Sequence, residues 1–187
     1  YKTDHHWNAL GSYEGYKDIA NMFGFMPKEP KRFVTFENTI FYGSEARNIA
    51  FYDIKEKFSA FEFEYSKHEE YLNGALSHYG KYPSYFTEIY STSPLTPYYA
   101  DFYGPDVAEV KYDYNNKLKD NLLILSSSFS NPINPLIASH FNKTYIVDLR
   151  HYENFNITDY LKKNDINKVL FIMDYSFITN QVFEIGE

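Results

Sequence analysis

The sequence predicts an α/β fold with a parallel sheet covered by helices. Three apolar segments in the last third, NLLILSS, TYIVDL and KVLFIMDY, have the composition of strands buried on both faces. Two segments of helical character separate them: SNPINPLIASHF, with Pro132 suited to a first helical position, and NITDYLKKND, with Thr158 as the expected N-cap. This order of strand, helix, strand, helix, strand is typical of a parallel sheet with helical crossovers.

The first element of the chain is expected to be a helix over residues 10–23. Its apolar residues recur at steps of three and four, as on one face of a helix: Leu10, Tyr13, Tyr16, Ala20 and Phe23. Asn8 is the expected N-cap, because its side chain can accept a hydrogen bond from an early backbone N–H. Gly24 and Pro27 are expected to end the helix.

The middle of the chain, residues 32–112, predicts a β-rich insertion. Short strands are expected at residues 32–36, 38–42, 48–54, 61–65 and 107–112. Phe61, Phe63 and Tyr65 alternate with glutamates, as in a strand with one buried face. Residues 67–76 indicate a short helix, and the proline-rich residues 79–105 an irregular surface segment. We therefore expect residues 1–187 to form a single domain that contains this insertion.

The composition excludes several classes of function. The chain has no cysteine, which excludes structural disulfides, thiolate zinc sites and a cysteine nucleophile. The net charge is −7 and no basic run exceeds two residues, so we expect no nucleic-acid partner. No apolar stretch reaches the roughly 18 residues that a membrane span needs, so membrane attachment would depend on an anchor upstream of Tyr1. The 20 tyrosines and 17 phenylalanines indicate either an AT-rich genome or aromatic platforms for sugar rings.

The residues best suited to acid–base chemistry gather near the N-terminus. The segment from Asp4 to Asn8 holds an acid, two of the six histidines and the only tryptophan. A histidine that a carboxylate orients can accept the proton of a serine hydroxyl. The serines that follow the first apolar strand, at the edge where parallel sheets place functional groups, include Ser128. A hydroxyl in such a turn can act as a nucleophile, and the backbone N–H groups there can stabilise an oxyanion.

Two segments together resemble a known family. TDHHWN near one end and LLILSSSFSNPINPLIASHFNKTYIVDLR near the other resemble the DHHW family of bacterial cell-envelope proteins. That family is similar to SGNH-type hydrolases and to the proteins that O-acetylate alginate. In this group a D-x-H motif supplies the acid and the base, and a later G-D-S-type turn supplies the nucleophile. Here the acid and the base precede the serine, which implies a circularly permuted motif order.

The resemblance implies a fold, a set of roles and an activity. The fold would be an SGNH-like, flavodoxin-like parallel sheet, and the chain the C-terminal part of a longer protein. Asp4 would orient His6, His6 would be the base and Ser128 the nucleophile. The implied activity is serine-dependent acyl-ester chemistry, by an O-acetyl esterase or O-acetyltransferase, on a cell-envelope or extracellular polysaccharide and without a cofactor. The resemblance also implies a secreted or cell-surface location in a bacterium.

Departures from the family pattern leave alternatives open. Ser126 and Ser127 stand where the pattern has glycine and aspartate, and no strand precedes the D-x-H loop. Both departures favour a second hypothesis, a non-catalytic surface protein that binds a glycan or a protein partner. Ser126, Ser127 and Ser130 are also alternatives to Ser128 as nucleophile, or the serines only cap the next helix. His6 could equally be a structural histidine.

A metal site is the alternative for the N-terminal motif. Asp4, His5 and His6 offer oxygen and nitrogen ligands, but adjacent histidines in a loop rarely aim at one ion. No spacing of the HExxH type supports such a site either. We therefore expect no bound metal.

Four further residues are candidates for substrate binding. Trp7 would stack on a sugar ring or wall the pocket, or else pack in the core. Asn131 and Asn134 would donate to an oxyanion, although asparagine before proline is common in turns. Arg150 follows the next strand and would bind a carboxylate of an acidic polysaccharide, or else pair with Asp148. We favour the ion pair.

Overall fold

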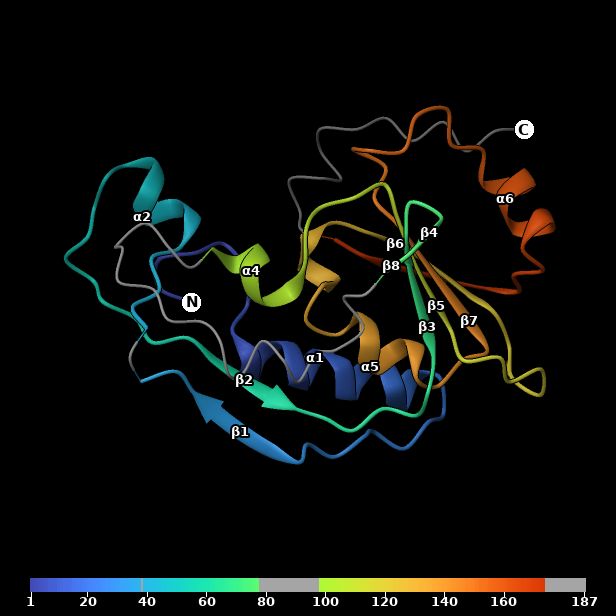
Figure 1. The fold of residues 1–187 in the computed structure, drawn as a ribbon, viewed down its shortest axis with the longest axis horizontal. Helices are drawn as coiled ribbons and strands as arrows, with labels where there is room; N and C mark the ends of the chain where they lie inside the picture. The colour runs from blue at the N-terminus through green and yellow to red at the C-terminus, as the bar shows by residue number, and fades with distance from the viewer. Residues whose placement is uncertain (38, 78–97, 174–187) are drawn as a thin grey trace. The chain divides into compact units, whose positions relative to one another are not determined.

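The computed structural model describes residues 1–37, 39–77 and 98–173. Within them the chain divides into two compact units (Figure 1). The first unit comprises Tyr1–Glu64 and the described part of Lys81–Pro105; the second comprises the described parts of Tyr65–Gly80 and Asp106–Glu187. Each unit is thus made of two separate stretches of sequence. The expectation of a single domain over residues 1–187 stays a prediction.

In its described residues, the first unit combines three helices with a two-stranded antiparallel sheet. Its elements are α1 (Ala9–Met22), β1 (Arg32–Thr35), α2 (Ser44–Asn48), β2 (Ser59–Glu62) and α4 (Tyr99–Tyr103). Strands β1 and β2 pair along their whole length, from Arg32 opposite Glu62 to Thr35 opposite Ser59. The core of this unit is largely aromatic, and the ring of Phe58 stacks on that of Phe102 with 3.5 Å between centroids.

Helix α1 begins and ends as the sequence predicts. The side chain of Asn8 accepts a hydrogen bond from the N–H of Gly11 at 2.9 Å. At the other end Gly24 adopts a φ of +76°, a conformation that favours glycine. The N–H of Phe25 then donates to the carbonyl of Ala20 at 2.8 Å, which closes the helix with a Schellman motif.

Two of the predicted strands of this unit are wrong. Residues 39–42 form a single bridge, from Phe41 to Glu56, and residue 38 lies outside the described residues. The strand predicted at residues 48–54 is instead the end of helix α2 and the turns that follow it. Helix α2 forms because the loop before α1 satisfies its first N–H groups, a distant contact that local sequence does not reveal.

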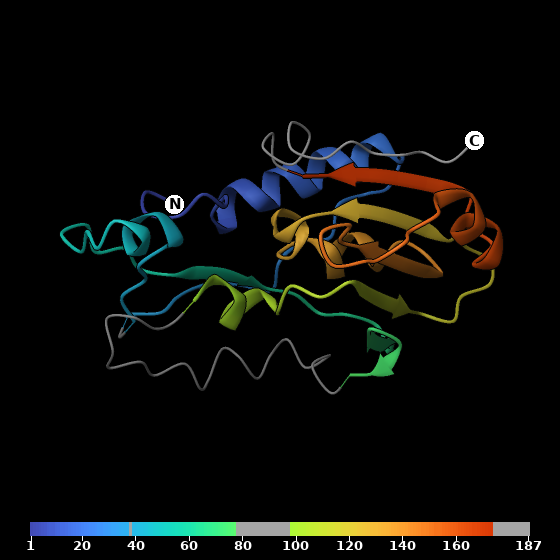
Figure 2. The same ribbon diagram turned by 90° about the horizontal axis from the view of Figure 1, so that it is seen from above.

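The second unit is built on a six-stranded mixed sheet in the order β4-β3-β5-β7-β6-β8. Its elements are β3 (Glu69–Leu72), β4 (Ala75–Leu76), β5 (Glu109–Asp113), β6 (Leu122–Ser126), the 3₁₀ helix η2 (Ser128–Ser130), α5 (Asn134–Ala138), β7 (Lys143–Val147), α6 (Ile157–Lys163) and β8 (Lys168–Ile172). Strands β7, β6 and β8 are parallel as predicted, and Figure 2 shows β6 and β8 pointing the same way. Strands β3, β4 and β5 add antiparallel pairs, so the fully parallel sheet is corrected to a mixed one.

Strand β6 lies inside this sheet and all five of its residues are buried. The helices α5 and α6 lie on opposite sides of the strands (Figure 1). Leu123 and Leu125 of β6 pack with Tyr160 of α6 in one buried cluster. Two predicted caps are wrong by a few residues: Asn156 rather than Thr158 caps α6, and Pro135 rather than Pro132 occupies the first turn of α5.

A hairpin replaces the helix that was predicted at residues 67–76. Strands β3 and β4 are joined by Asn73 and Gly74, whose φ angles are +47° and +79°. These angles fit the type I′ turn that Asn-Gly favours, so the turn signal decides the structure against the helical spacing. Residues 79–97 of the predicted irregular segment lie outside the described residues, and α4 follows them.

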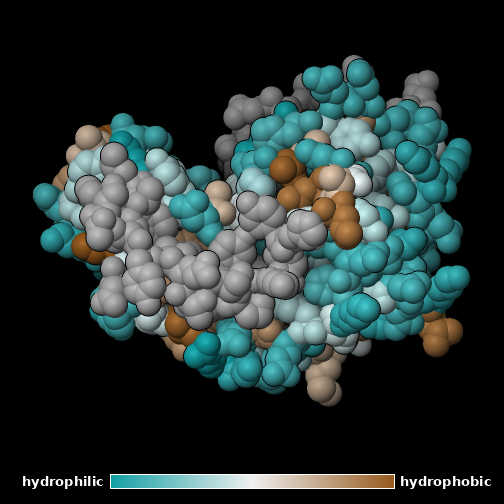
Figure 3. Space-filling model, viewed as in Figure 1, coloured by the Kyte–Doolittle hydropathy of each residue, from teal (hydrophilic) through white to brown (hydrophobic). Residues whose placement is uncertain are grey.

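The surface carries no sign of a bilayer-crossing element within the described residues. None of the described helices combines the length and the apolar character that crossing a membrane requires. The face drawn in Figure 3 is mostly hydrophilic.

Two glycines of α1 give a matched test of how Trp7 packs. A Cβ on Gly15 would lie 2.7 Å from Cζ3 of Trp7, whereas on Gly11 its nearest contact is an ordinary 3.5 Å. We expect Gly11→Ala to stabilise the protein by about 0.5–1 kcal/mol through helix propensity. Gly15→Ala should instead destabilise it by about 1–3 kcal/mol, since the clash outweighs that gain. Urea unfolding followed by the fluorescence of Trp7 measures both, and equal stabilisation by the two variants would contradict this packing.

Candidate active site

A buried carboxylate–imidazole pair lies in the loop before α1. Nδ1 of His6 is 2.6 Å from Oδ1 of Asp4, and the backbone N–H of His6 donates to the same oxygen at 2.9 Å. The side chains of His6 and Asp4 are only 7% and 3% exposed. Because Asp4 engages Nδ1, Nε2 is the ring nitrogen that can take up a proton. This is the geometry that a general base needs.

Helix α2 holds the other oxygen of Asp4. The N–H of Ser44 donates to Oδ2 of Asp4 at 2.8 Å, at the point where α2 begins. Gly43 makes this approach possible, since a Cβ there would lie 2.2 Å from Cβ of Asp4 and 2.3 Å from the carbonyl oxygen of Thr3. Neither Gly43 nor Ser44 was identified from the sequence, where no motif links them to the N-terminal loop.

Glu56 fastens the first residues of the same loop. Its carboxylate accepts hydrogen bonds from the backbone N–H groups of Lys2 and Thr3, both at 2.8 Å, and from the hydroxyl of Thr3. The carbonyl of Thr3 in turn accepts from the N–H groups of Glu45 and Ala46 in α2. The residues just before Asp4 are therefore fastened both to Glu56 and to α2.

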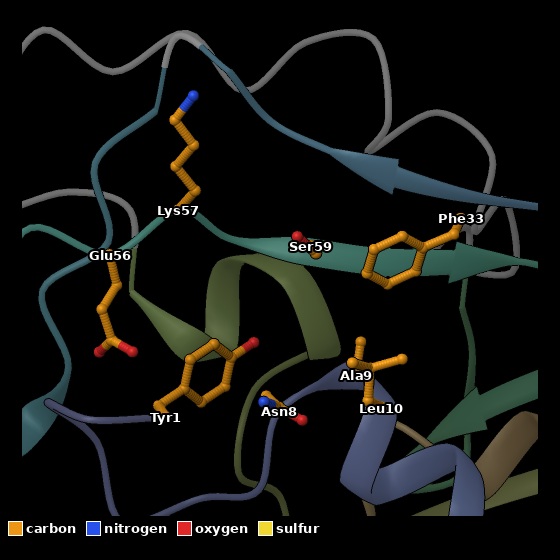
Figure 4. A pocket seen from close by; sticks show the side chains of 8 residues that line it. All are labelled: Tyr1, Asn8, Ala9, Leu10, Phe33, Glu56, Lys57 and Ser59. Atoms are coloured by element: carbon orange, nitrogen blue, oxygen red, sulfur yellow. The ribbon is translucent and has the colours of Figure 1, made fainter.

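A cavity of about 130 Å³ lies beside this loop, next to Tyr1 and Glu56 (Figure 4). Four of its polar side chains, Asn8, Glu56, Lys57 and Ser59, already have hydrogen-bond or ion-pair partners within the chain. The cavity is thus lined by groups that support the loop and the strand β2.

The described residues contain one group that could hold a metal ion. Ligand atoms of Asp4, His5 and His6 lie within 4.8 Å of one another. Nδ1 of His5 lies 2.8 Å from Oγ of Ser44, and Nδ1 of His6 is engaged by Asp4, so a metal would have to compete with these hydrogen bonds. The expectation that no metal binds stays a prediction.

Four serines lie at the end of strand β6 and in the turn after it, and the hydroxyl groups of three of them are hydrogen bonded inside the turn. The hydroxyl groups of Ser126 and Ser130 are hydrogen bonded to each other, and Ser126 donates to the carbonyl of Ser127 at 2.6 Å. The hydroxyl of Ser127 caps η2 by accepting from the N–H of Phe129. These three serines are at most 4% exposed, whereas Ser128 is half-buried. Ser128 is therefore the serine of this turn that retains surface for a substrate.

The turn does not need the glycine that the family pattern has there. Among the described residues with positive φ, none lies between Ser126 and Asn131. Ser127 itself is extended, with a φ of −108°. The replacement of Gly-Asp-Ser by Ser126-Ser127-Ser128 therefore places no non-glycine residue at a positive φ in this turn.

Asn131 and Asn134 lie directly after Ser128. The N–H of Asn131 donates to the carbonyl of Ser128 at 3.2 Å and ends η2. Asn134 is the first residue of α5 and is 3% exposed, and its Oδ1 has no hydrogen-bond partner among the described residues. An unsatisfied buried amide is costly in a structural role, so Asn134 stays a candidate for a functional one.

The other two candidates for substrate binding have structural partners. Nε of Arg150 donates to Oδ1 of Asp148 at 2.9 Å, and its guanidinium also reaches Asp106 at 3.3 Å. The favoured ion pair of Arg150 with Asp148 is thus present. Trp7 is half-buried and its ring packs over Gly15 of α1.

The candidate residues are divided between the two units. Asp4, His6 and Trp7 belong to the first unit, and Ser128, with the asparagines and the arginine, belongs to the second. The structure brings Asp4 and His6 into contact. The meeting of this pair with Ser128 in one triad stays a prediction.

Comparison with known proteins places this chain beside two groups of solved structures. No family model matches the sequence, and no curated protein does. Two structures of PatB1 from Bacillus cereus, one of them with a sulfonyl adduct, match over 100% of this chain with 26% and 27% identity and TM-scores of 0.74 and 0.71. A DHHW family protein from Eubacterium siraeum matches over 91% with 26% identity and a TM-score of 0.68. The resemblance to the DHHW family is confirmed.

This chain shares its fold with these neighbours but corresponds to only part of their length. This chain spans 64% and 65% of the PatB1 chains and 57% of the DHHW family protein, which is less than two thirds of each. The mixed α/β fold agrees with these neighbours. The circularly permuted SGNH order stays a prediction.

The charge of Asp4 gives a prediction about acid stability. Burial alone would raise the pKa of Asp4, but hydrogen bonds from the His6 side chain and from the N–H groups of His6 and Ser44 outweigh it and hold the pKa well below its ordinary value. A lowered pKa in the folded state contributes stability above the unfolded value of about 3.9, and this contribution is lost as the pH falls below it. Asp4→Asn should thus cost about 1–3 kcal/mol at pH 7. The cost should shrink below about pH 4.

Chemical denaturation across a pH series measures this difference. Asp18→Asn, which changes an exposed carboxylate of α1, is the matched control and should leave stability nearly unchanged at every pH. A cost of Asp4→Asn that stays constant down to pH 2 would contradict the assigned role of the Asp4 charge.

Proposed function

We propose that this chain carries out serine-dependent acyl-ester chemistry on a polysaccharide of the bacterial cell envelope or cell surface. It would act as an O-acetyl esterase or an O-acetyltransferase. The observation that carries the proposal is the buried contact of 2.6 Å between Asp4 and His6, which prepares Nε2 of His6 to take a proton. The likeness to a DHHW family protein supports the same class of chemistry.

The neighbour that carries a sulfonyl adduct adds independent support. Activated sulfonyl reagents form adducts with nucleophilic side chains, and an activated serine is a typical target. PatB1 with such an adduct matches this chain over its whole length. In this chain Ser128 is the serine of its turn that is half-buried and follows a buried parallel strand, so it is the expected counterpart of a reactive nucleophile.

The proposed reaction has two halves. Oγ of Ser128 attacks the ester carbonyl while its proton passes to Nε2 of His6. The ester C–O bond then breaks, and the departing hydroxyl takes that proton, which leaves acyl-Ser128. Water or a sugar hydroxyl next attacks the acyl carbon and gives its proton to His6, and the proton returns to Ser128 as the acyl group leaves. The negative Asp4 stabilises the imidazolium in both halves.

The substrate contacts belong to the proposal as well. Asn134 would donate from its Nδ2 amide group to the oxyanion that forms when the ester carbonyl is attacked. Asn131 would assist from the same turn, while Trp7 and Arg150 would bind the sugar. In the structure Arg150 is paired with Asp148, and Trp7 packs on α1.

Hydrolysis of 4-nitrophenyl acetate tests the proposal. Ser128→Ala should remove nearly all of the activity, because the nucleophile is lost. His6→Ala should lose about 10²–10⁴-fold, and combining the two changes should cost no more than either one, because the residues act as a unit. Asp4→Asn should cost less than His6→Ala, since Asp4 orients the base without touching the substrate.

Three neighbouring serines serve as matched controls. Ser126→Ala, Ser127→Ala and Ser130→Ala remove hydroxyl groups that are bonded inside the turn, so each should retain activity if the protein stays folded. If Ser128→Ala and the three control variants all hydrolyse the ester as fast as the wild type, the proposal fails. A non-catalytic module that binds a glycan or a protein would then explain the chain better.

A labelling experiment tests the nucleophile without a turnover assay. Phenylmethylsulfonyl fluoride should form one bond from sulfur to Oγ of Ser128, with loss of fluoride and transfer of the serine proton to His6. Mass spectrometry of peptides should find the added group on Ser128 in the wild type and on no residue in His6→Ala. Labelling that is equal in these two proteins would contradict activation by His6.

A further inference from the structure

The imidazole of His6 is enclosed on its faces as well as at Nδ1. The ring of Tyr99 lies parallel to it, with 3.7 Å between the centroids and 6° between the planes. Both residues are 7% exposed. A separation this short with parallel planes is a face-to-face stack, so Tyr99 covers one whole face of the imidazole.

His5 covers the opposite face. The centroid of its ring lies 3.9 Å from that of His6, with 36° between the planes. Two ring centres come this close only when one ring lies over the face of the other, and Tyr99 already occupies one face. The ring of His6 therefore lies between Tyr99 and His5, while Asp4 engages Nδ1 in the plane of the ring.

Tyr99 connects His6 to the aromatic core of the first unit. It belongs to the buried cluster that includes Phe41 and Phe58, and its ring lies 4.8 Å from that of Tyr103 on the same helix. His6 is in a loop, where a side chain is less firmly held than on a packed helix. The stack with Tyr99 therefore transfers the rigidity of the core to the imidazole.

We propose that Tyr99 is a positioning residue for His6. This inference rests on the proposed function, in which His6 is the base. The parallel stack prevents the imidazole from turning about its Cβ–Cγ bond, so Nδ1 stays on Asp4 and Nε2 keeps one orientation for taking up the proton. The negative face of the phenol ring also attracts the imidazolium that exists after His6 has taken the proton.

Proton NMR of the His6 imidazole tests the stack directly. A short hydrogen bond to a carboxylate shifts the Nδ1–H proton strongly downfield, and a fixed ring keeps that resonance sharp. Tyr99→Phe keeps the stack and should keep the resonance. Tyr99→Leu should broaden or remove it and should lower the hydrolysis of 4-nitrophenyl acetate by about 10–100-fold, because a misplaced base reacts slowly.

Tyr103→Leu is the matched control, since it removes a half-buried tyrosine from the same helix without touching the imidazole. It should destabilise the protein to a similar degree, yet keep the resonance and the activity. Loss of the resonance in Tyr103→Leu, or its persistence in Tyr99→Leu, would overturn the inference, and so would its loss in Tyr99→Phe.

Two further outcomes keep the test decisive. Nuclear Overhauser effects between the ring protons of His6 and Tyr99 in the wild type are expected even if Tyr99→Leu fails to fold, and their absence would overturn the stack. If neither the wild type nor any variant hydrolyses the ester, the proposed function fails. The resonance and the Overhauser effects would still decide whether Tyr99 positions His6.

Discussion

The carboxylate of Asp4 connects three parts of the first unit. One oxygen binds the ring and the backbone of His6, and the other accepts the first N–H of helix α2 from Ser44. A buried charge is costly unless it is fully hydrogen bonded, so α2, the loop and the imidazole are mutually dependent. Gly43 belongs to this arrangement because a side chain there would collide with Asp4. The N-terminal motif is thus a structural junction as well as a candidate catalytic group.

The serines at the end of β6 differ in how deeply they are buried. Ser126, Ser127 and Ser130 satisfy the backbone and one another where β6 ends, and they are buried. Ser128 stands among them with part of its surface exposed. Burial rather than residue type therefore singles out Ser128 as the proposed nucleophile among these serines.

The parts of the fold that local sequence determines were predictable. The parallel strands β6, β7 and β8 are apolar runs, and the pair of Arg150 with Asp148 lies two residues apart in the chain. The hairpin at Asn73 and Gly74 is wrongly predicted as a helix, although its Asn-Gly turn signal is present in the sequence.

The remaining features depend on contacts between distant segments. Helix α2 forms against the N-terminal loop, β5 joins the sheet as an antiparallel neighbour of β7, and Tyr99 reaches His6 from α4. No motif in the sequence marks these pairings. The D-x-H motif pointed to Asp4 and His6, which are in contact, whereas the residues that hold their loop, Gly43, Ser44 and Glu56, became visible only in three dimensions.

The distance between the hydroxyl of Ser128 and the imidazole of His6 tests the central claim most directly. A crystal structure of the protein would measure it. The account predicts Oγ of Ser128 within about 2.6–3.2 Å of Nε2 of His6, or one bridging water away, with Asp4 still on Nδ1. A structure in which the two atoms are farther apart than one water can bridge, or in which another serine of the turn faces Nε2, would contradict it.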